Sequence, residues 1–264
     1  MLAEERRQKI LELIYRDGQV SGMELCRLLH VSDETIRRDL AEMAASHPIK
    51  KVHGGAVLVA GQRFREEPYE RRRERNAEQK RLIGIAAARH IADDDVIALD
   101  SGTGAEAIAE AISGVSGVRI ITGALPVAQI LLRKRTNGDF SGKIYFVGGE
   151  LHSAGKNVSG GLAADALRRY QADKVFVGAT AVSENGISVW DEDDGLYSAA
   201  LVGGAPEVIA YAESEKLGKE SFFRVCPLEA LSCLITDGET EMPTGLRKAL
   251  VGAGVRVEFA AKHG

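Results

Sequence analysis

Residues 32–55, SDETIRRDLAEMAASHPIKKVHGG, constrain the fold of this chain more than any other segment. Ser32 can cap a helix, because its side-chain oxygen can accept from the first free backbone N–H groups. The apolar residues that follow at four- and three-residue spacing are Ile36, Leu40 and Met43. The opposite face and its flanks carry Glu34, Thr35, Arg37, Arg38 and Ala41. The spacing predicts a helix with one buried stripe and with Arg38 pointing outward.

Two further helices are predicted before this one. Residues 4–16 place Ile10, Leu13 and Ile14 on one face, and Gly18 ends the pattern. Ser21 and Glu24 have the spacing of a capping box for a second helix. Its predicted inner face carries Leu25, Leu28 and Leu29, and His30-Val31 forms the turn into the third helix. This order predicts a helix-turn-helix unit.

A basic β-hairpin is predicted directly after the third helix, which Pro48 stops. Residues 49–53 and 56–59 have strand patterns and are joined through Gly54-Gly55. The hairpin is a wing that carries Lys50, Lys51 and His53. A winged helix-turn-helix indicates double-stranded DNA as a partner, whereas a three-helix bundle with a solvated charged face is the alternative. The wing favours DNA.

Each predicted DNA-binding residue has an expected role. Glu34 and Arg38 are candidates for base edges, and Thr35 and Arg37 can reach bases or phosphates. Ser32 should meet phosphate at the helix N-terminus. The wing residues should anchor on the backbone or in an adjacent minor groove, although a histidine beside a turn, such as His53, often has a structural role.

Length and charge indicate two domains. The chain has 264 residues, 45% of them hydrophobic, and a formal charge of -4. Residues 1–59 hold nine basic and nine acidic residues, residues 60–81 hold eight and five, and the remainder holds seventeen and twenty-four. We predict a DNA-binding domain at 1–59, a linker at 60–81 and a larger α/β domain at 82–264. The acidic charge lies mainly in the last of these.

The linker carries Arg71, Arg72, Arg73 and Arg75 interleaved with Glu66, Glu67, Glu70 and Glu74. These arginines could touch DNA phosphates, but pairing with the glutamates on a solvated helix is favoured. Asn76 and Gln79 give a second capping signal, for a helix that runs on to His90.

The three cysteines and the N-terminus bound the cellular context. Cys26, Cys226 and Cys233 fall inside apolar patterns without CxxC spacing, so we expect buried thiols and neither a disulfide nor a metal site. The first residues, MLAEERRQK, lack the apolar stretch of a signal peptide. We therefore expect a cytoplasmic chain with no membrane segment and no cofactor.

From residue 96 onward, short apolar runs end in glycine-rich or hydroxyl-bearing turns. The runs are residues 96–99, 118–121, 144–147, 175–177, 208–212, 233–235 and 255–259. Helical stretches fall near residues 106–112, 127–132, 163–170 and 245–250. This alternation predicts an α/β domain with a mainly parallel sheet, in which ligands bind at the carboxyl ends of strands.

The turn Asp100-Ser101-Gly102-Thr103-Gly104 suits a phosphate, because its small residues let backbone N–H groups face an anion at a helix N-terminus. Other turns at strand ends are Thr122-Gly123, Gly148-Gly149 and Gly178-Ala179. Lys216 could supply a positive charge. Glycine is also common in such turns for structural reasons alone, so the turns indicate a site mainly through their recurrence.

Several motifs, in order along nearly the whole chain, resemble those of DeoR-type bacterial transcriptional regulators. They are EERRQKILELI, VSDETIRRDL, KKVHGGAV, NAEQKRLIG, DSGT, VGGEL, ADKVFVGA and SEKLG. The resemblance implies a winged helix-turn-helix repressor of sugar or nucleoside catabolism genes. It implies a C-terminal domain similar in fold to ribose-phosphate isomerases that binds a phosphorylated sugar, which weakens operator binding.

The resemblance implies an effector site at Lys80, Asp100, Gly102, Thr103, Thr122, Gly148, Gly149, Gly178, Glu192 and Lys216. Other positions depart from the family pattern. Gly123-Ala124 replaces Asn-Ser, Thr180 replaces Asp, His152 replaces Arg, Gly155 replaces Ser, and Ser198-Ala199 replaces a basic pair. Losing two basic side chains removes charge-assisted contacts to phosphate. We hypothesise that the pocket recognises an atypical ligand or binds the usual kind weakly.

Two other functions remain open. A sugar-phosphate isomerase would need a carboxylate after the strand at 175–177, where this chain reads GATAVS. Asp191, Glu192, Asp193 and Asp194 could serve instead, but four adjacent acids are more typical of a solvated loop. In the second alternative, the C-terminal domain only assembles a DNA-binding oligomer. A dimer or tetramer is expected in any DNA-binding interpretation, because paired half-sites match two-fold symmetry.

Overall fold

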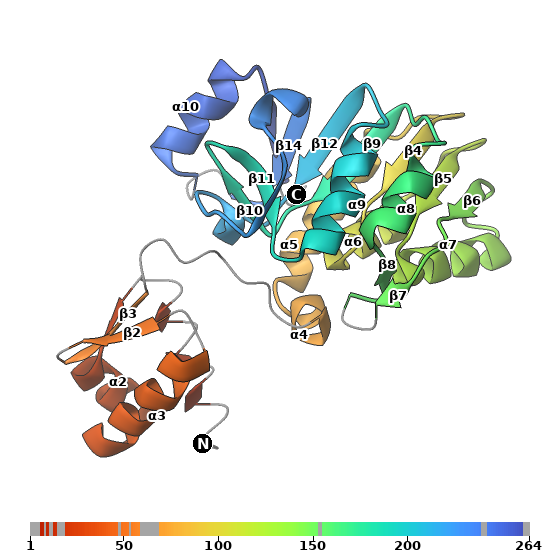
Figure 1. Ribbon diagram of the computed structural model, residues 1–264. Coiled ribbons are helices and arrows are strands. Elements are labelled where there is room, and N and C mark those ends of the chain that lie inside the picture. Colours follow the sequence, from red (N-terminus) through yellow and green to blue (C-terminus); the bar gives the residue numbers. More distant parts are fainter. Residues whose placement is uncertain are drawn as a thin grey trace. The chain divides into compact units, whose positions relative to one another are not determined.

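The computed structural model describes residues 6–7, 9–10, 13–14, 19–46, 49–52, 54–58, 69–152, 155–238 and 242–260 (Figure 1). The chain divides into two compact units, Met1–Gln62 and Arg63–Gly264. Of the predicted linker at 60–81, residues 69–81 form a short helix and the start of the next one, both in the second unit. No helix among the described residues is long and apolar enough to span a membrane.

The first unit contains the predicted helices around a small core. The described residues between 6 and 14 are helical, and α2 (Gly22–Leu29) and α3 (Asp33–Ser46) follow. Its fully buried side chains include Ile10, Ile14, Leu25, Ile36, Leu40 and Met43. The prediction for Leu28 is wrong, because its side chain is 60% exposed. Helix α2 has only eight residues, and the leucines of its buried face are Leu25 and Leu29.

The wing has three strands instead of the two predicted. β2 (Ile49–Val52) and β3 (Gly55–Leu58) form the hairpin, and β1 (Gln19–Ser21) pairs with β3 on its other side. All pairings are antiparallel. A Cβ on Gly55 would lie 1.9 Å from the Val20 carbonyl oxygen, so only glycine allows this close pairing. His53 lies outside the described residues.

Neither predicted capping box forms. Ser21 makes no side-chain cap bond to α2, since it is also the last residue of β1 and pairs there with Gly55. Asn76 precedes α5 without a side-chain cap bond, because its left-handed backbone (φ 51°) makes the turn that follows α4. Helix α5 ends at Ala88, two residues before the predicted end at His90.

The second unit is built on a seven-stranded sheet whose strand pairs are all parallel, as predicted. Its order is β15-β14-β12-β9-β4-β5-β6. The bounds are β4 Val96–Leu99, β5 Arg119–Thr122, β6 Lys143–Phe146, β9 Lys174–Gly178, β12 Glu207–Tyr211, β14 Cys233–Thr236 and β15 Arg256–Phe259. Each predicted strand is present within one residue at either end.

Helices cover both faces of this sheet. They are α4 Tyr69–Glu74, α5 Ala77–Ala88, α6 Thr103–Ala111, α7 Leu125–Asn137, α8 Gly160–Leu167, α9 Glu192–Val202 and α10 Thr244–Gly252, with single 3-10 turns at Ser214–Lys216 and Leu228–Ala230. Helices α5, α6 and α7 share one core with the sheet, and α8, α9 and α10 share the other. Figure 1 shows α8 and α9 side by side over the sheet.

Helix α9 corrects the prediction of a solvated acidic loop at residues 191–194. The Asp191 carboxylate accepts from the backbone N–H groups of Asp193 at 3.0 Å and Asp194 at 3.2 Å, which makes it the N-cap of α9. Acidic side chains in a first helical turn also interact favourably with the helix dipole. The acidic run therefore starts a helix.

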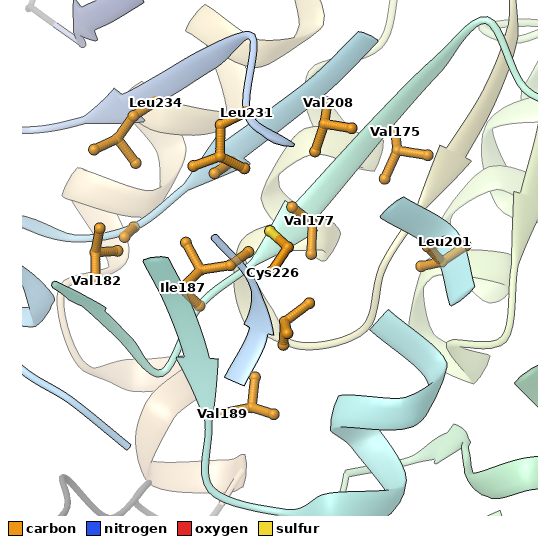
Figure 2. Close-up of a cluster of buried hydrophobic side chains, with 14 of the residues drawn as sticks. Val175, Val177, Val182, Ile187, Val189, Leu201, Val208, Cys226, Leu231 and Leu234 are labelled. Atoms are coloured by element: carbon orange, nitrogen blue, oxygen red, sulfur yellow. The ribbon is translucent and has the colours of Figure 1, made fainter. Parts of the chain in front are cut away.

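A second, antiparallel sheet was not predicted. It consists of β10 (Ala181–Ser183), β11 (Gly186–Val189) and β13 (Phe223–Cys226). Figure 2 shows its side chains Val182, Ile187 and Val189 in the same buried cluster as Val177 and Val208 of the parallel sheet. A two-stranded pair, β7 (Leu151–His152) with β8 (Asn157–Val158), completes the unit. The small sheet thus covers one face of the core beside α9.

Candidate functional site

The outer face of α3 is a candidate nucleic-acid surface. Glu34, Arg37 and Arg38 are exposed, and Thr35 is half-buried, whereas Ile36, Leu40 and Met43 are buried beneath them. Lys50 and Lys51 are exposed on β2. The side chains therefore have the orientation that DNA contact requires, and the contact itself stays a prediction.

Ser32 fixes the start of α3. Its Oγ accepts from the Thr35 backbone N–H at 3.3 Å and lies 2.9 Å from Thr35 Oγ1. This is the cap that the sequence predicts. The Ser32 and Thr35 hydroxyls are hydrogen-bonded to each other, and both remain at the N-terminal end of the helix, where phosphate contacts are common.

Asp39 is a buried charge that the sequence analysis missed. Its carboxylate accepts from Arg6 Nε at 2.5 Å and from Arg7 Nε at 3.2 Å, and only 2% of the residue is exposed. Arg7 also pairs with the more exposed Glu42 at 2.7 Å. Asp39 therefore joins the first helical segment to α3. The signal was an acid beside Leu40, at the edge of an otherwise apolar stripe.

A pocket in the second unit lies at the carboxyl ends of β4, β9 and β12, which are neighbours in the sheet. Seven predicted effector residues line it: Asp100, Ser101, Gly102, Thr103, Gly104, Gly178 and Lys216. The other lining residues are Arg72, Gly155, Asn157, Ala179, Thr180, Val189, Asp194, Ser198, Tyr211 and Glu213. The pocket lies where ligands usually bind in parallel α/β sheets.

Five predicted effector residues do not line this pocket: Lys80, Thr122, Gly148, Gly149 and Glu192. Thr122 ends β5 and the two glycines follow β6, and both strands lie on the side of β4 away from β9 and β12. Thr122 Oγ1 is buried and accepts from the Ala124 N–H at 3.1 Å. Glu192 is exposed in the first turn of α9.

Lys80 is held by protein acceptors instead of facing the pocket. Its ammonium donates to the Arg72 carbonyl at 2.5 Å and to the Arg75 carbonyl, and it lies 3.5 Å from Glu213 Oε1. Burial lowers the pKa of Lys80, and Glu213 opposes that effect. These three acceptors match the three N–H bonds of an ammonium group. Lys80 can therefore act on the site only through Glu213 and the end of α4.

Asp100 is the buried polar centre of the pocket. It accepts from Ser101 N at 2.8 Å, Ser198 Oγ at 2.9 Å and Gly178 N at 3.2 Å. Burial raises the pKa of Asp100 to about 7, although the bonds from Ser101, Ser198 and Gly178 each act to lower it. The carboxyl group can therefore exchange a proton near neutral pH.

Glu213 and Lys216 form the second polar group. Lys216 Nζ lies 2.8 Å from Glu213 Oε2. Burial alone would raise the pKa of Glu213, but Lys216 and Lys80 together lower it to about 2. The pocket thus contains the carboxyl groups of Asp100, Asp194 and Glu213 beside the cationic side chains of Lys216 and Arg72.

Two of the positions that depart from the family pattern, Ser198 and Gly123, contact buried side chains at the site. Ser198, at a position that usually carries a basic residue, donates to Asp100. A Cβ on Gly123 would lie 2.8 Å from the Tyr197 hydroxyl oxygen, so Tyr197 fills the space of the usual Asn side chain. Asn157 Nδ2 donates to Asp194 Oδ1 at 2.8 Å, while its buried Oδ1 has no hydrogen-bond partner in the described part of the chain.

Arg72 reaches the predicted phosphate-binding turn from α4. Its Nη1 lies 3.6 Å from the position that a Cβ on Gly102 would occupy. Gly102 has φ 96°, which a glycine adopts readily. Two ion pairs of this segment, Glu70 with Lys156 and Arg75 with Glu215, join it to residues outside the predicted linker. The sequence did not distinguish Arg72 as a pocket residue, because the residues on either side of it are also charged.

Three potential metal ligands meet elsewhere in the second unit. Donor atoms of His90, Cys233 and Glu258 lie within 4.8 Å of one another, and His90 Nε2 lies 2.7 Å from Glu258 Oε2. Arg256 Nη2 is 3.4 Å from His90 Nδ1. A guanidinium there disfavours a second cation by charge repulsion, so we assign a hydrogen-bonded cluster and no metal.

Two protein-family models match this chain. A DeoR-like helix-turn-helix domain matches residues 6–62, and a DeoR C terminal sensor domain matches residues 75–238. The HTH-type transcriptional repressor GlcR of Bacillus subtilis is 32% identical over 238 residues, which cover 90% of this chain and 89% of that protein. The lactose phosphotransferase system repressor of Streptococcus mutans is 31% identical, covering 90% of this chain and 93% of that protein.

Solved structures show more distant similarity. Ribose 5-phosphate isomerase A of Methanocaldococcus jannaschii has a TM-score of 0.38 and 16% identity, over 54% of this chain and 55% of that one. A transcriptional regulator of Streptococcus pneumoniae has a TM-score of 0.39 and 14% identity, over 66% and 86%. The sequence matches, which include both domains, decide the family. The chain belongs to the DeoR family of helix-turn-helix regulators with a C-terminal sensor domain.

Proposed function

We propose that this chain is a sequence-specific transcriptional repressor that binds duplex DNA through α3 and the wing, and that a phosphorylated sugar in the pocket of the second unit weakens this binding. The observation that carries the proposal is the exposed row of Glu34, Arg37 and Arg38 above a buried apolar stripe. Two relatives across nearly the whole chain are named as repressors. The chain is accordingly a regulator and not an enzyme.

Arg38 and Glu34 would read base edges in the major groove, with Arg37 and Thr35 reaching bases or phosphates. Ser32 and the N-terminus of α3 would meet phosphate, and Lys50 and Lys51 would hold the wing on the backbone. The first unit carries as many acidic as basic residues up to position 59, so its non-specific affinity should be modest. A dimer or tetramer acting in the cytoplasm would supply the remaining affinity.

The DNA proposal is tested with a duplex that the purified protein selects from a random library. Arg38→Ala should cost about 1 to 3 kcal/mol and relax specificity at one position. Lys51→Ala should weaken all sequences alike and reduce the salt dependence by about one ion. Lys248→Ala on α10 removes the same charge from the second unit and should change neither. Arg38→Ala binding the selected duplex like the unchanged protein would refute the role of α3.

The effector proposal rests on the turn at Ser101–Gly104. Backbone N–H groups at the N-terminus of α6 attract anions, and hydroxyl groups of Ser101 and Thr103 stand in the same turn. Because Ser198 replaces a basic residue, we expect weaker binding of common hexose phosphates than a fully basic pocket would give. Calorimetric titration with ribose 5-phosphate, glucose 6-phosphate and fructose 1-phosphate tests this. Tight binding of a common hexose phosphate would contradict the altered specificity.

The isomerase alternative loses its main chemical group in the structure. Isomerases of this fold resemble GADEID in this segment, and Thr180 stands where they carry the first aspartate. Thr180 lines the pocket and is buried. A hydroxyl group at its ordinary pKa is a poor general base. An assay for aldose–ketose interconversion with the same sugar phosphates separates the two functions, since a regulator should show no turnover.

A further inference from the structure

Helix α4 (Tyr69–Glu74) is the first described element of the second unit, which begins at Arg63 directly after the first unit in the sequence. It contributes Arg72 to the pocket, where the other lining residues lie at the ends of β4, β9, β11 and β12, at the start of β8, or in α6 and α9. A ligand in the pocket can therefore touch the element that continues directly toward the DNA-binding unit.

The start of α4 is attached to two segments that line the pocket. The Tyr69 hydroxyl donates to Glu106 Oε1 at 2.6 Å, and Glu106 lies in the first turn of α6, just after the Asp100–Gly104 turn. Glu70 pairs with Lys156 at 2.6 Å, and the Lys156 ammonium lies 4.4 Å from the centre of the Tyr69 ring. Lys156 stands between the lining residues Gly155 and Asn157.

The end of α4 is attached to a third lining segment. Lys80 binds the carbonyl oxygens of Arg72 and Arg75 and lies 3.5 Å from Glu213. Arg75 Nη2 also lies 2.7 Å from Glu215 Oε2. Glu213 and Lys216 line the pocket. A bound ligand would thus lie beside all three segments that hold α4. A shift in any of these segments would change the hydrogen bonds and ion pairs that α4 makes with them.

We propose that Arg72 is the guanidinium that contacts the effector's phosphate group, and that α4 transmits occupancy of the pocket to the DNA-binding unit. This inference rests on the proposed sugar-phosphate function of the same pocket. Arg72 Nη1 stands beside Gly102, where a phosphate at the N-terminus of α6 would lie. Its planar fork can bind two phosphate oxygens at once, which would replace the basic contact missing at Ser198.

The buried Oδ1 of Asn157 is an independent sign of a ligand. Asn157 is 2% exposed and lines the pocket, and this oxygen has no hydrogen-bond partner in the described part of the chain. A buried acceptor without a donor is costly unless something else satisfies it. A sugar hydroxyl group can donate to it while the phosphate of the same ligand contacts Arg72. The ligand class is therefore a polyol phosphate.

The coupling needs only a difference in Arg72 contacts between two states. A ligand shifts a conformational equilibrium by its differential affinity for the two conformations and no more. Phosphate contact with Arg72 favours the position of α4 that brings the guanidinium to the turn. By linkage, the DNA-bound state then disfavours the ligand by the same factor by which the ligand disfavours DNA.

The experiment compares Arg72→Ala with Arg73→Ala, which removes the same charge from an exposed position on the same helix. Both variants and the unchanged full-length protein are titrated calorimetrically with glucose 6-phosphate, ribose 5-phosphate, fructose 1-phosphate and the matching unphosphorylated sugars. DNA affinity is measured by fluorescence anisotropy on the selected duplex, with and without saturating sugar phosphate. Thermal melting reports whether each variant is folded.

Arg72→Ala should lower the affinity for the sugar phosphate that binds by about 10- to 100-fold and leave the unphosphorylated sugar nearly unchanged. At saturation it should also lose most of the ligand's effect on DNA affinity, whereas Arg73→Ala should keep both properties. Equal sugar-phosphate affinity in Arg72→Ala overturns the contact, and an undiminished DNA response at saturation overturns the transmission. If the unchanged protein binds none of the sugar phosphates, the proposed effector function itself fails.

Arg72→Lys separates contact geometry from charge. The variant keeps the positive charge and loses the two-pronged fork. We expect an affinity between those of the unchanged protein and Arg72→Ala, with the same ranking in the DNA response. A lysine variant equal to Arg72→Ala in affinity, although folded, also supports the guanidinium contact, while one that binds more tightly than the unchanged protein contradicts it.

Discussion

Lys134 of α7 offers a sharp test of how the second unit is stabilised. Lys134 is 8% exposed. Its ammonium group donates to the carbonyl oxygens of Ala109 at 3.3 Å, Glu110 at 2.5 Å and Ile112 at 2.6 Å. These carbonyls end α6, where a helix has acceptors without internal donors. Lys134→Met keeps the apolar stem of the side chain and removes the donor group.

The expected loss of stability combines three effects. Each buried carbonyl left without a donor costs about 1 to 3 kcal/mol. Loss of a positive charge at a helix C-terminus adds about 0.3 to 1 kcal/mol. Burial of the ammonium opposes both, and it lowers the pKa of Lys134. A net loss of about 2 to 4 kcal/mol follows, or about 5 to 15 °C in Tm for a unit of this size.

Urea unfolding followed by tryptophan fluorescence measures this loss in the second unit alone, because the chain has one tryptophan, Trp190, which lies there. Arg133→Met is the matched control. Arg133 is the neighbouring residue on α7 and pairs with the Glu110 carboxylate through side chains that are 58% and 49% exposed. Such exposed pairs contribute about 1 kcal/mol or less. A Lys134→Met loss within about 0.5 kcal/mol of the control would refute the capping role.

Three further outcomes are expected. Asp39→Asn should destabilise the first unit by about 1.5 to 3 kcal/mol, because it removes the buried charge that accepts hydrogen bonds from Arg6 and Arg7; Glu42→Gln, at the more exposed end of the same network, should lose less than about 1 kcal/mol by hydrogen exchange. Asp100 has a folded pKa of about 7 against an ordinary 3.8, so between those values the folded chain binds a proton that the unfolded chain has lost, and stability should fall as pH rises from about 4 to 7. Asp100→Asn should flatten this pH dependence of Tm, and an equally steep profile would contradict the assignment. Gly123→Asn should cost about 1 to 3 kcal/mol by crowding Tyr197, and the same substitution should cost less when it is made in a Tyr197→Val background; equal costs in the two backgrounds would contradict the crowding.

Local periodicity was enough to predict the helices of the first unit and the strands of the parallel sheet. The buried stripe of α3 follows the 3.6-residue period, and the central parallel strands are apolar runs because both of their faces are covered. The cap at Ser32 was also predictable, since it depends on residues three apart.

The antiparallel sheet was not predictable in the same way. β11 pairs with β13, which follows it by more than thirty residues, and β10 has only three residues. Pairing over such a distance depends on the core beneath it and has no local period. Helix α9 was missed for another reason, because Asp191 was interpreted as part of a solvated loop when its position before the run made it an N-cap.

The pocket was half predictable. The Asp100–Gly104 turn has a local signature, and Gly178 and Lys216 follow neighbouring strands. Strand order decides which of several similar turns converge, and the sequence did not supply it. For this reason the sequence could not tell that Thr122, at the end of β5, and Gly148 and Gly149, after β6, lie apart from this pocket. The role of Arg72 as a lining residue could not be predicted without knowing where α4 packs.

The pairing of β1 with β3 ties the wing to the rest of the first unit. The Gly22 N–H donates to the Gly54 carbonyl at 2.7 Å, and Gly55 has no room for a methyl group beside Val20. Any side chain at position 55 must separate these strands. Substitution of Gly55 should therefore weaken operator binding and leave the fold of the second unit unchanged. Such variants should lose repression while their second unit remains folded.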